Sequence, residues 1–157
     1  MFEVKQIGKG NISGQLKINK ILYECGKDMV KRYNLHHWDN SKLKNCIIMA
    51  LCELKNSVFL VTENGKPVAT FQVRLDRSSL YFEKLACLPS CSRKGVGSYC
   101  IKYIEEMAKK EKCKKVCMDV YSESFHALEF YLHRGYTVCG ETISLKYKEV
   151  KMEKVLQ

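Results

Sequence analysis

The segment 92-SRKGVGSYCIKYIEEMAKK-110 combines two features that are usually kept apart. Gly95 and Gly97 lie in a basic, hydroxyl-bearing turn, and an amphipathic helix begins before that turn has ended. Glycine lowers helix propensity, so glycines at a helix start indicate an unusual backbone turn or the close approach of another molecule. Amides at a helix N-terminus, together with the helix dipole, bind anions such as phosphate. The spacing is compatible with a phosphate-binding turn, but on these residues alone an ordinary loop is the better interpretation.

The net charge is compatible with an anionic ligand but does not identify one. Among the 157 residues, 27 are Lys or Arg and 17 are Asp or Glu, so the formal net charge is +10. Such an excess attracts polyanions, whether nucleic acid, anionic lipid or a phosphorylated cofactor. Basic runs such as 109-KKEKCKK-115 are also typical of solvated helix ends, and no basic patch interleaved with aromatic residues indicates RNA binding.

Nine cysteines raise the question of a disulfide scaffold or a metal centre. No two of them have CxxC spacing and no His lies at ligand spacing from one, so we expect no structural zinc and no bound metal. Most of them fall in apolar runs, where a reduced Cys packs as a small hydrophobic side chain.

The length and composition indicate one folded domain over residues 1–157, with 46% apolar and 28% charged residues and 2 prolines. The opening residues, MFEVKQIGKG, lack the apolar core of a signal peptide. No apolar run approaches the roughly 18 residues that a membrane span needs. We therefore expect a cytoplasmic protein.

The hydrophobic periodicity of the chain predicts an alternation of strands and helices. The turn signal Asn64-Gly65 predicts a hairpin between two strand-like runs in 57–75. Residues 14–33 predict one or two helical pieces broken near Gly26, and Ser41 can cap a helix that reaches about residue 54. The other expected elements are strands at 2–7, 79–88 and 115–121, helices from about 96 to 110 and 126 to 134, and a strand pair within 136–156.

Two segments carry a resemblance to a known family. The run 85-LACLPSCSRKGVGS-98 resembles the acetyl-CoA signature of the GNAT N-acetyltransferase superfamily, and 127-ALEFYLHRGY-136 resembles its later helix. The resemblance implies an α/β fold with a mixed, mostly antiparallel sheet of about seven strands flanked by helices. The family loop pattern is Gln or Arg, two residues, Gly, any residue, then Gly or Ala. Ser92 departs from this pattern, while Gly95 and Gly97 keep it, and Arg93 and Lys94 keep the loop basic.

The resemblance also implies where acetyl-CoA contacts the chain. The loop from Ser92 through Arg93, Lys94, Gly95, Val96 and Gly97 to Ser98 is expected to hold its pyrophosphate. Main-chain groups of Leu85 and Cys87 are expected to pair with the pantetheine arm. Ser124 replaces an Asn that the family often has and is a further candidate for the cofactor arm.

Tyr131 is the candidate for chemistry that the resemblance implies, as the acid that protonates the departing CoA thiolate. Its helical spacing with Ala127, Phe130 and Arg134 is equally typical of a core residue. Direct transfer to an amine needs no acyl-enzyme, so Cys87 is interpreted as a small buried side chain rather than a nucleophile.

A base must remove a proton from the amine. Glu83 is the first candidate, because family members often use a carboxylate near this position, and Asp119 or a chain of water molecules is the alternative. An exposed salt bridge would explain Glu83 equally well.

The acceptor pocket is expected near 35-LHHWDN-40, because early helices set acceptor choice in this superfamily. His36, His37 and Trp38 could line a pocket for a cationic amine through cation-π contact. A packed Trp with capping neighbours would give the same sequence.

We expect an enzyme that moves an acetyl group from acetyl-CoA to a primary amine, with a small molecule or a peptide as acceptor. The alternative is a non-catalytic module of the same fold that binds acyl-CoA or nucleic acid. No membrane partner is expected, and nucleic acid is the less favoured ligand. The acceptor and the oligomeric state, a homodimer included, stay open.

Overall fold

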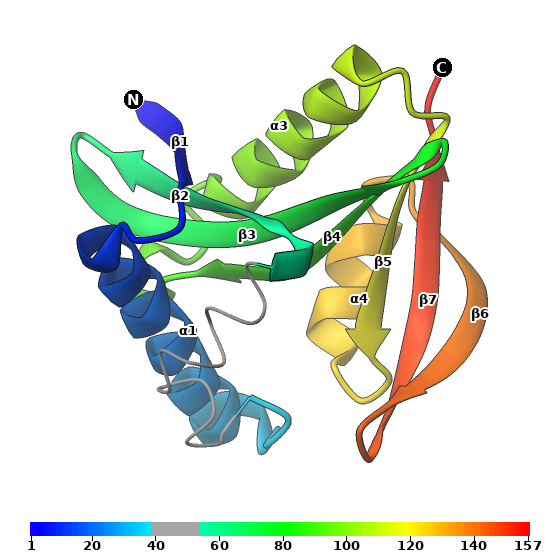
Figure 1. The fold of residues 1–157 in the computed structure, drawn as a ribbon. Helices are drawn as coiled ribbons and strands as arrows, with labels where there is room; N and C mark the ends of the chain where they lie inside the picture. Colours follow the sequence, from blue (N-terminus) through cyan, green and yellow to red (C-terminus); the bar gives the residue numbers. More distant parts are fainter. Residues whose placement is uncertain (39–53) are drawn as a thin grey trace. The chain divides into compact units, whose positions relative to one another are not determined.

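The computed structural model describes residues 1–38 and 54–157. Seven strands form one mixed sheet in the order β1-β2-β3-β4-β5-β7-β6, with helices flanking it (Figure 1). The predicted fold class is therefore confirmed. The helix expected from 41 to 54 lies almost entirely outside the described residues. The strands are β1 Phe2–Ile7, β2 Ser57–Glu63, β3 Lys66–Asp76, β4 Ser79–Cys87, β5 Lys115–Tyr121, β6 Thr137–Ser144 and β7 Tyr147–Val155, and the helices are α1 Ile12–Tyr33, η2 Pro89–Cys91, α3 Val96–Lys110 and α4 Phe125–Leu132.

The β2–β3 hairpin forms where the sequence predicted it. Asn64 and Gly65 both have positive φ, 50° and 79°, as a two-residue turn of type I′ requires. The two strands pair antiparallel, with a register shift between Val61 and Thr62. The preference of Asn-Gly for a type I′ turn is a local property, so the sequence alone locates this hairpin.

The chain divides into two compact units. Residues 1–74 and 84–103 form unit 1, and residues 75–83 and 104–157 form unit 2. The strands β3 and β4 and the helix α3 each continue from one unit into the other.

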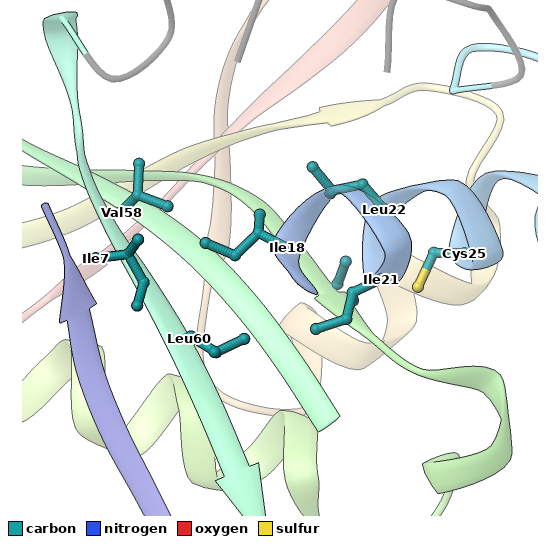
Figure 2. Packing of buried hydrophobic residues seen from close by; sticks show 8 residues of the cluster. Ile7, Ile18, Ile21, Leu22, Cys25, Val58 and Leu60 are labelled. Atoms are coloured by element: carbon teal, nitrogen blue, oxygen red, sulfur yellow. The ribbon is translucent and has the colours of Figure 1, made fainter. Parts of the chain in front are cut away.

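Unit 1 has its core between α1 and the strands beside it. Figure 2 shows the α1 side chains turned toward residues of β1 and β2. Burial of such aliphatic groups contributes roughly 1.5–3 kcal/mol per side chain and fixes α1 on the sheet. The cluster consists of Ile7, Ile18, Ile21, Leu22, Cys25, Val58, Leu60 and Ala86.

The break expected near Gly26 is wrong, because α1 is one continuous helix of 22 residues. Gly26 is buried, and a Cβ there would lie 2.8 Å from the carbonyl oxygen of Trp38. The glycine therefore makes room for the returning chain rather than ending the helix. The helix ends at Asn34, which has the left-handed conformation typical of a C-terminal cap.

Unit 2 is built on the strands β5, β7 and β6, which pair antiparallel. β4 pairs parallel with β5 from Ser79 opposite Lys115 to Tyr81 opposite Cys117. An aromatic group with Phe82, Tyr131 and Tyr136 packs in this unit, with ring centroids 5.9–6.4 Å apart.

Across the described part of the chain, no helix has both the length and the apolar character that a bilayer span needs.

Candidate functional site

The turn between β4 and α3 lies in unit 1 and is held from its N-terminal side. The amide of Leu88 donates to the carbonyl of Val68 at 2.8 Å, and the η2 turn closes with the amide of Ser92 donating to the carbonyl of Pro89 at 3.1 Å. After that point the side chains of Ser92, Arg93 and Lys94 are exposed. A fixed strand end therefore leads into an open, basic turn.

The backbone of this turn has an unusual conformation. Arg93 has φ 60° and Gly95 has φ 82°, so two residues on either side of Lys94 lie in the left-handed region. A non-glycine residue there is uncommon and generally reflects a structural constraint. A Cβ built on Gly95 meets nothing within 4 Å, so open space adjoins this glycine.

The helix α3 begins directly behind Gly95. The first helical hydrogen bond runs from the amide of Tyr99 to the carbonyl of Gly95 at 3.0 Å. The amides of Val96 and Gly97 precede it and have no carbonyl of their own helix to donate to. The first turn of α3 contains no acidic residue. Amides without a helical acceptor, the positive end of the helix dipole and two basic side chains thus favour an anion at this turn.

The side chains in this turn differ in burial. Val96 is buried, whereas Ser98 is exposed and Gly97 is half-buried. The start of the helix therefore combines a buried apolar side chain with exposed polar side chains.

The end of β4 carries Leu85 and Cys87, both half-buried, on either side of the buried Ala86. The thiol of Cys25 donates a hydrogen bond to the carbonyl of Cys87 at 2.9 Å. Lys84, just before this stretch, has φ 50° although it lies inside a strand. Sequence reasoning missed this irregularity, because Lys is not a residue that marks left-handed positions.

Tyr131 lies in unit 2 on α4, and its side chain is 9% exposed. Its ring contacts Phe82 at 5.9 Å and Phe130 at 5.2 Å between centroids. The neighbouring Tyr136 donates its hydroxyl to Glu105 at 3.1 Å, and Lys154 approaches the same carboxylate at 2.9 Å. Burial, together with the charge of Glu105, raises the pKa of Tyr136, so this phenol stays protonated. Tyr131 is therefore both a packing residue and a candidate acid.

Ser124 is buried, with 3% exposure, and precedes α4. Its carbonyl accepts from the amides of Ala127 and Leu128, both at 3.0 Å, while its side chain makes no capping hydrogen bond. The main chain of Ser124 thus starts the helix.

Carboxylates gather on the strands of unit 2. Glu83 is exposed on β4, and Asp119 on β5 forms an ion pair with Lys151 at 3.3 Å. Glu149 on β7 was not expected from the sequence. Burial raises the pKa of Glu149, and the charges of Asp119 and Glu83 raise it further, whereas Lys151 opposes them. Because the charges of Glu83 and Asp119 act on Glu149, the three carboxylates form one electrostatic group. Only the strand register, which places Glu149 opposite Tyr121, could have indicated that Glu149 is a member of this group.

The segment proposed for the acceptor follows α1 in unit 1. His36 is exposed, and its Nε2 lies 2.9 Å from Asn34 Oδ1. His37 and Trp38 are half-buried with ring centroids 5.9 Å apart, and Trp38 packs against the unit 1 core. These contacts match the packing alternative for Trp38, and they leave the side chain of His36 accessible. Asp39 and Asn40 lie outside the described residues.

The cysteines in the described residues carry free thiols. Cys25, Cys100, Cys113 and Cys117 are buried, Cys87 and Cys91 are half-buried, and Cys139 is exposed. No group of three or more His, Cys, Asp or Glu side chains that could hold a metal ion occurs within residues 1–38 and 54–157.

Comparison with known proteins identifies related chains. The sequence model of the acetyltransferase (GNAT) family matches residues 20–136. YdhI, an uncharacterised protein of Bacillus subtilis (strain 168), is 22% identical over 113 residues, which cover 72% of this chain and 69% of YdhI.

Solved structures share the fold. The PaiA N-acetyltransferase of Thermoplasma acidophilum, in complex with coenzyme A, aligns with a TM-score of 0.78 at 14% identity and covers 99% of both chains. The ribosomal-protein-S18-alanine N-acetyltransferase of Escherichia coli aligns with a TM-score of 0.70 at 12% identity, over 99% of this chain and 94% of that one. At these identities the likeness shows the fold.

Proposed function

Because the chain belongs to the acetyltransferase (GNAT) family, we propose that it transfers an acetyl group from acetyl-CoA to a primary amine by direct attack on the thioester. The observation that carries the proposal is the turn before α3. There, two left-handed residues, an open glycine and basic side chains lead into a helix whose first turn has no acid.

The residues of this turn fit the pyrophosphate of CoA. The backbone amides of Val96 and Gly97 supply hydrogen-bond donors, and Gly95 and Gly97 let phosphate oxygens approach the main chain. Arg93 and Lys94 add positive charge, and Ser92 and Ser98 add exposed hydroxyls. In this proposal backbone amides and basic side chains supply the phosphate contacts. The turn from 92 to 98 therefore does not need the family Gln or Arg that Ser92 replaces. The main chain of Leu85 and Cys87, with Ser124, is proposed for the pantetheine arm.

The chemistry needs one acid and one base. Tyr131 is proposed as the acid, because its hydroxyl can give a proton to the departing thiolate while its ring stays fixed among Phe82, Phe130 and Tyr136. Glu83 is proposed as the base that takes the proton of the amine. Asp119 is a weaker candidate, because its carboxylate is engaged with Lys151. The thioester supplies the acetyl group, and no thiol of the protein takes part as a nucleophile.

We further propose that residues 1–157 act as one acetyltransferase domain in the cytoplasm. The elements β3, β4 and α3 belong to both units, which supports a single domain. The acceptor class is a primary amine, cationic before it loses a proton. Glu83 and its neighbouring carboxylates would suit such a charge.

The experiment is a mass-shift screen of amines with acetyl-CoA. The panel contains amino acids, polyamines, aminoglycosides and peptides with free N-termini, and acetylation adds one acetyl group to the product mass. Mass detection avoids the background that nine protein thiols would give in a thiol-release assay. We expect transfer to at least one class, with loss of rate in Tyr131→Phe.

The competing function has a distinct signature. A non-catalytic module would bind CoA or nucleic acid without transferring acetyl to any amine of the panel. Salt-dependent retention of RNA without acetyl transfer would favour that function and contradict the proposed one.

A further inference from the structure

The outer face of α1 is the side of this helix that lies away from the core of unit 1. Figure 2 shows the inner side, where Ile18 and Ile21 are turned toward β1 and β2. On the outer face Ile12 and Leu16 lie one turn apart and are 68% and 54% exposed. Tyr23 follows two turns later and is half-buried. Lysines flank these three side chains, so α1 carries a second apolar row within a basic surface. The outer face consists of Ile12, Leu16, Lys17, Lys20, Tyr23, Lys27 and Lys31.

The two acidic side chains of α1 are already engaged by basic side chains of the same helix. Glu24 pairs with Lys27 at 3.4 Å, and Asp28 pairs with Arg32 at 2.9 Å. Lys27 also lies over the ring of Tyr23, 4.6 Å from its centroid. The other lysines of the outer face are exposed, and no carboxylate of α1 balances their charge. The outer face therefore attracts an anionic surface.

The pattern of side chains distinguishes between the anionic partners that such a face can bind. A nucleic acid would neutralise the lysines but leave Ile12 and Leu16 in water. A stable protein interface needs about 800 Å² on each partner around an apolar centre, and lysine is depleted in such interfaces. A bilayer with anionic headgroups offers both components, because its surface attracts lysines while its acyl boundary accepts aliphatic side chains. Tyrosine is also typical of the headgroup level. The pattern therefore favours a bilayer.

We propose that the outer face of α1 docks on an anionic lipid bilayer, with the helix lying along the surface. Ile12 and Leu16 enter the boundary between headgroups and acyl chains, and the long lysine side chains extend back to the lipid phosphates. The sequence argued against a membrane partner through the lack of a spanning run, and a helix that lies on a bilayer needs no such run. This docking rests on unit 1 alone and does not depend on acetyl transfer.

The first experiment measures co-sedimentation of the full chain with lipid vesicles. One set contains phosphatidylglycerol mixed into phosphatidylcholine, and the other contains phosphatidylcholine alone. Each is tested at about 0.1 M and about 1 M salt, between which the screening length falls from about 10 Å to about 3 Å. We expect binding to the mixed vesicles at the lower salt, and loss of binding at the higher salt or without phosphatidylglycerol. Equal binding to both sets, or binding to neither, would overturn the proposal.

Paired lysine variants test whether the charge of this face is responsible. Each lysine near an anionic surface strengthens binding about fivefold, so Lys17→Gln combined with Lys20→Gln should weaken it about 25-fold. The matched control combines Lys102→Gln with Lys110→Gln, which removes the same charge from exposed positions of α3. This control should bind vesicles within about twofold of the wild type. Equal losses in both double variants would trace the attraction to the net charge of the chain and overturn docking through α1. Retention of RNA without vesicle binding would assign the face to nucleic acid instead.

Variants of Leu16 separate insertion from attraction by charge alone. Leu16→Gln keeps the net charge and should weaken vesicle binding about fivefold, because roughly half of the leucine is still to be removed from water. Thermal melts should match the wild type, since the side chain is exposed. Leu16→Trp adds a fluorophore at this position, and the wild type, whose single Trp is Trp38, gives the baseline. We expect its emission to shift to the blue on mixed vesicles and to be quenched by brominated lipids. An unshifted emission at full vesicle binding would overturn the docked arrangement.

Discussion

Gly26 and Gly95, both in unit 1, occupy different structural settings. Gly26 lies inside α1, and a Cβ there would press to within 2.8 Å of the Trp38 carbonyl oxygen. Gly95 directly precedes α3 and has φ 82°. A Cβ added to Gly95 would have no neighbouring atom within 4 Å. The first glycine is required by a neighbouring chain segment, and the second by its own backbone conformation.

The surroundings of these glycines differ in the same way. Beside Gly26 the chain returns through Trp38, which packs against the buried cluster of unit 1. Around Gly95 the side chains of Ser92, Arg93 and Lys94 are exposed. A substitution in the packed region around Gly26 should therefore alter the free energy of unfolding. A substitution in the exposed turn around Gly95 should alter ligand binding.

Trp38→Ala should have the largest effect, on stability. Removing a packed Trp leaves a cavity, and the cost should be about 3 kcal/mol, the low end of the usual range, because the ring is only half-buried. Chemical denaturation measures the free energy of unfolding, and calorimetry measures CoA affinity on the folded fraction. We expect CoA affinity within about twofold of the wild type. A higher KM for the amine at unchanged stability would instead assign Trp38 to the acceptor pocket.

Gly97→Val should have the next largest effect, on CoA binding. A branched side chain beside the amides of α3 would block a phosphate, and the loss of these hydrogen bonds should weaken binding about 100-fold, or about 2.8 kcal/mol. Stability should hold, because Val is no worse a helix former than Gly. Calorimetry with CoA gives the affinity, and thermal melts give the stability.

Gly97→Ala is the matched control, because the family pattern accepts Gly or Ala at this position. It should keep most of the affinity. Unchanged CoA affinity in a folded Gly97→Val protein would remove the phosphate-binding role of this turn.

Sequence reasoning succeeded where structure is determined locally. Asn64-Gly65 gave the hairpin, and the periodicity of 115–121 gave β5 with its observed bounds. It failed at Gly26, because no local signal separates a glycine that ends a helix from one that admits a distant backbone. The raised pKa of Glu149 was missed for the same reason, because it depends on Asp119 and Glu83, which lie far away in the chain. The left-handed Lys84 was missed because Lys does not mark such positions.

Tyr131→Phe tests a place where packing and chemistry coincide. The change removes one oxygen and leaves the ring among its aromatic neighbours, so folding and CoA affinity should persist. Turnover should fall about 10- to 100-fold, since a CoA thiolate is a fairly good leaving group and needs less help than a poor one. The loss should appear in kcat and kcat/KM alike, measured by mass detection of the acetylated amine.

The matched control for this prediction is Tyr136→Phe, which removes the hydroxyl that donates to Glu105. It should cost about 0.5–1.5 kcal/mol of stability, because Glu105 loses one donor and keeps Lys154, and leave kcat nearly unchanged. If both variants turn over at the wild-type rate, Tyr131 is a packing residue only, and another donor protonates the thiolate.

Glu149→Gln should have the smallest effect on stability, and the size of that effect should depend on pH. In the folded protein, burial first and the charges of Asp119 and Glu83 next raise the pKa of Glu149 above its ordinary value of 4.5. A carboxyl whose folded pKa is raised binds its proton more tightly in the folded state than in the unfolded state. Its favourable contribution is complete below the unfolded pKa and is lost as pH rises through the folded pKa. The glutamine variant should therefore be slightly more stable than the wild type at neutral pH, and this advantage should vanish below about pH 4.

Glu153→Gln is the opposite control, because it breaks the 2.6 Å pair with Lys115 and should lower stability at neutral pH. Urea unfolding at a series of pH values measures both variants. A Glu149→Gln protein that is less stable than the wild type at neutral pH would show that Ser144 and Lys151, which favour the charged form, outweigh burial.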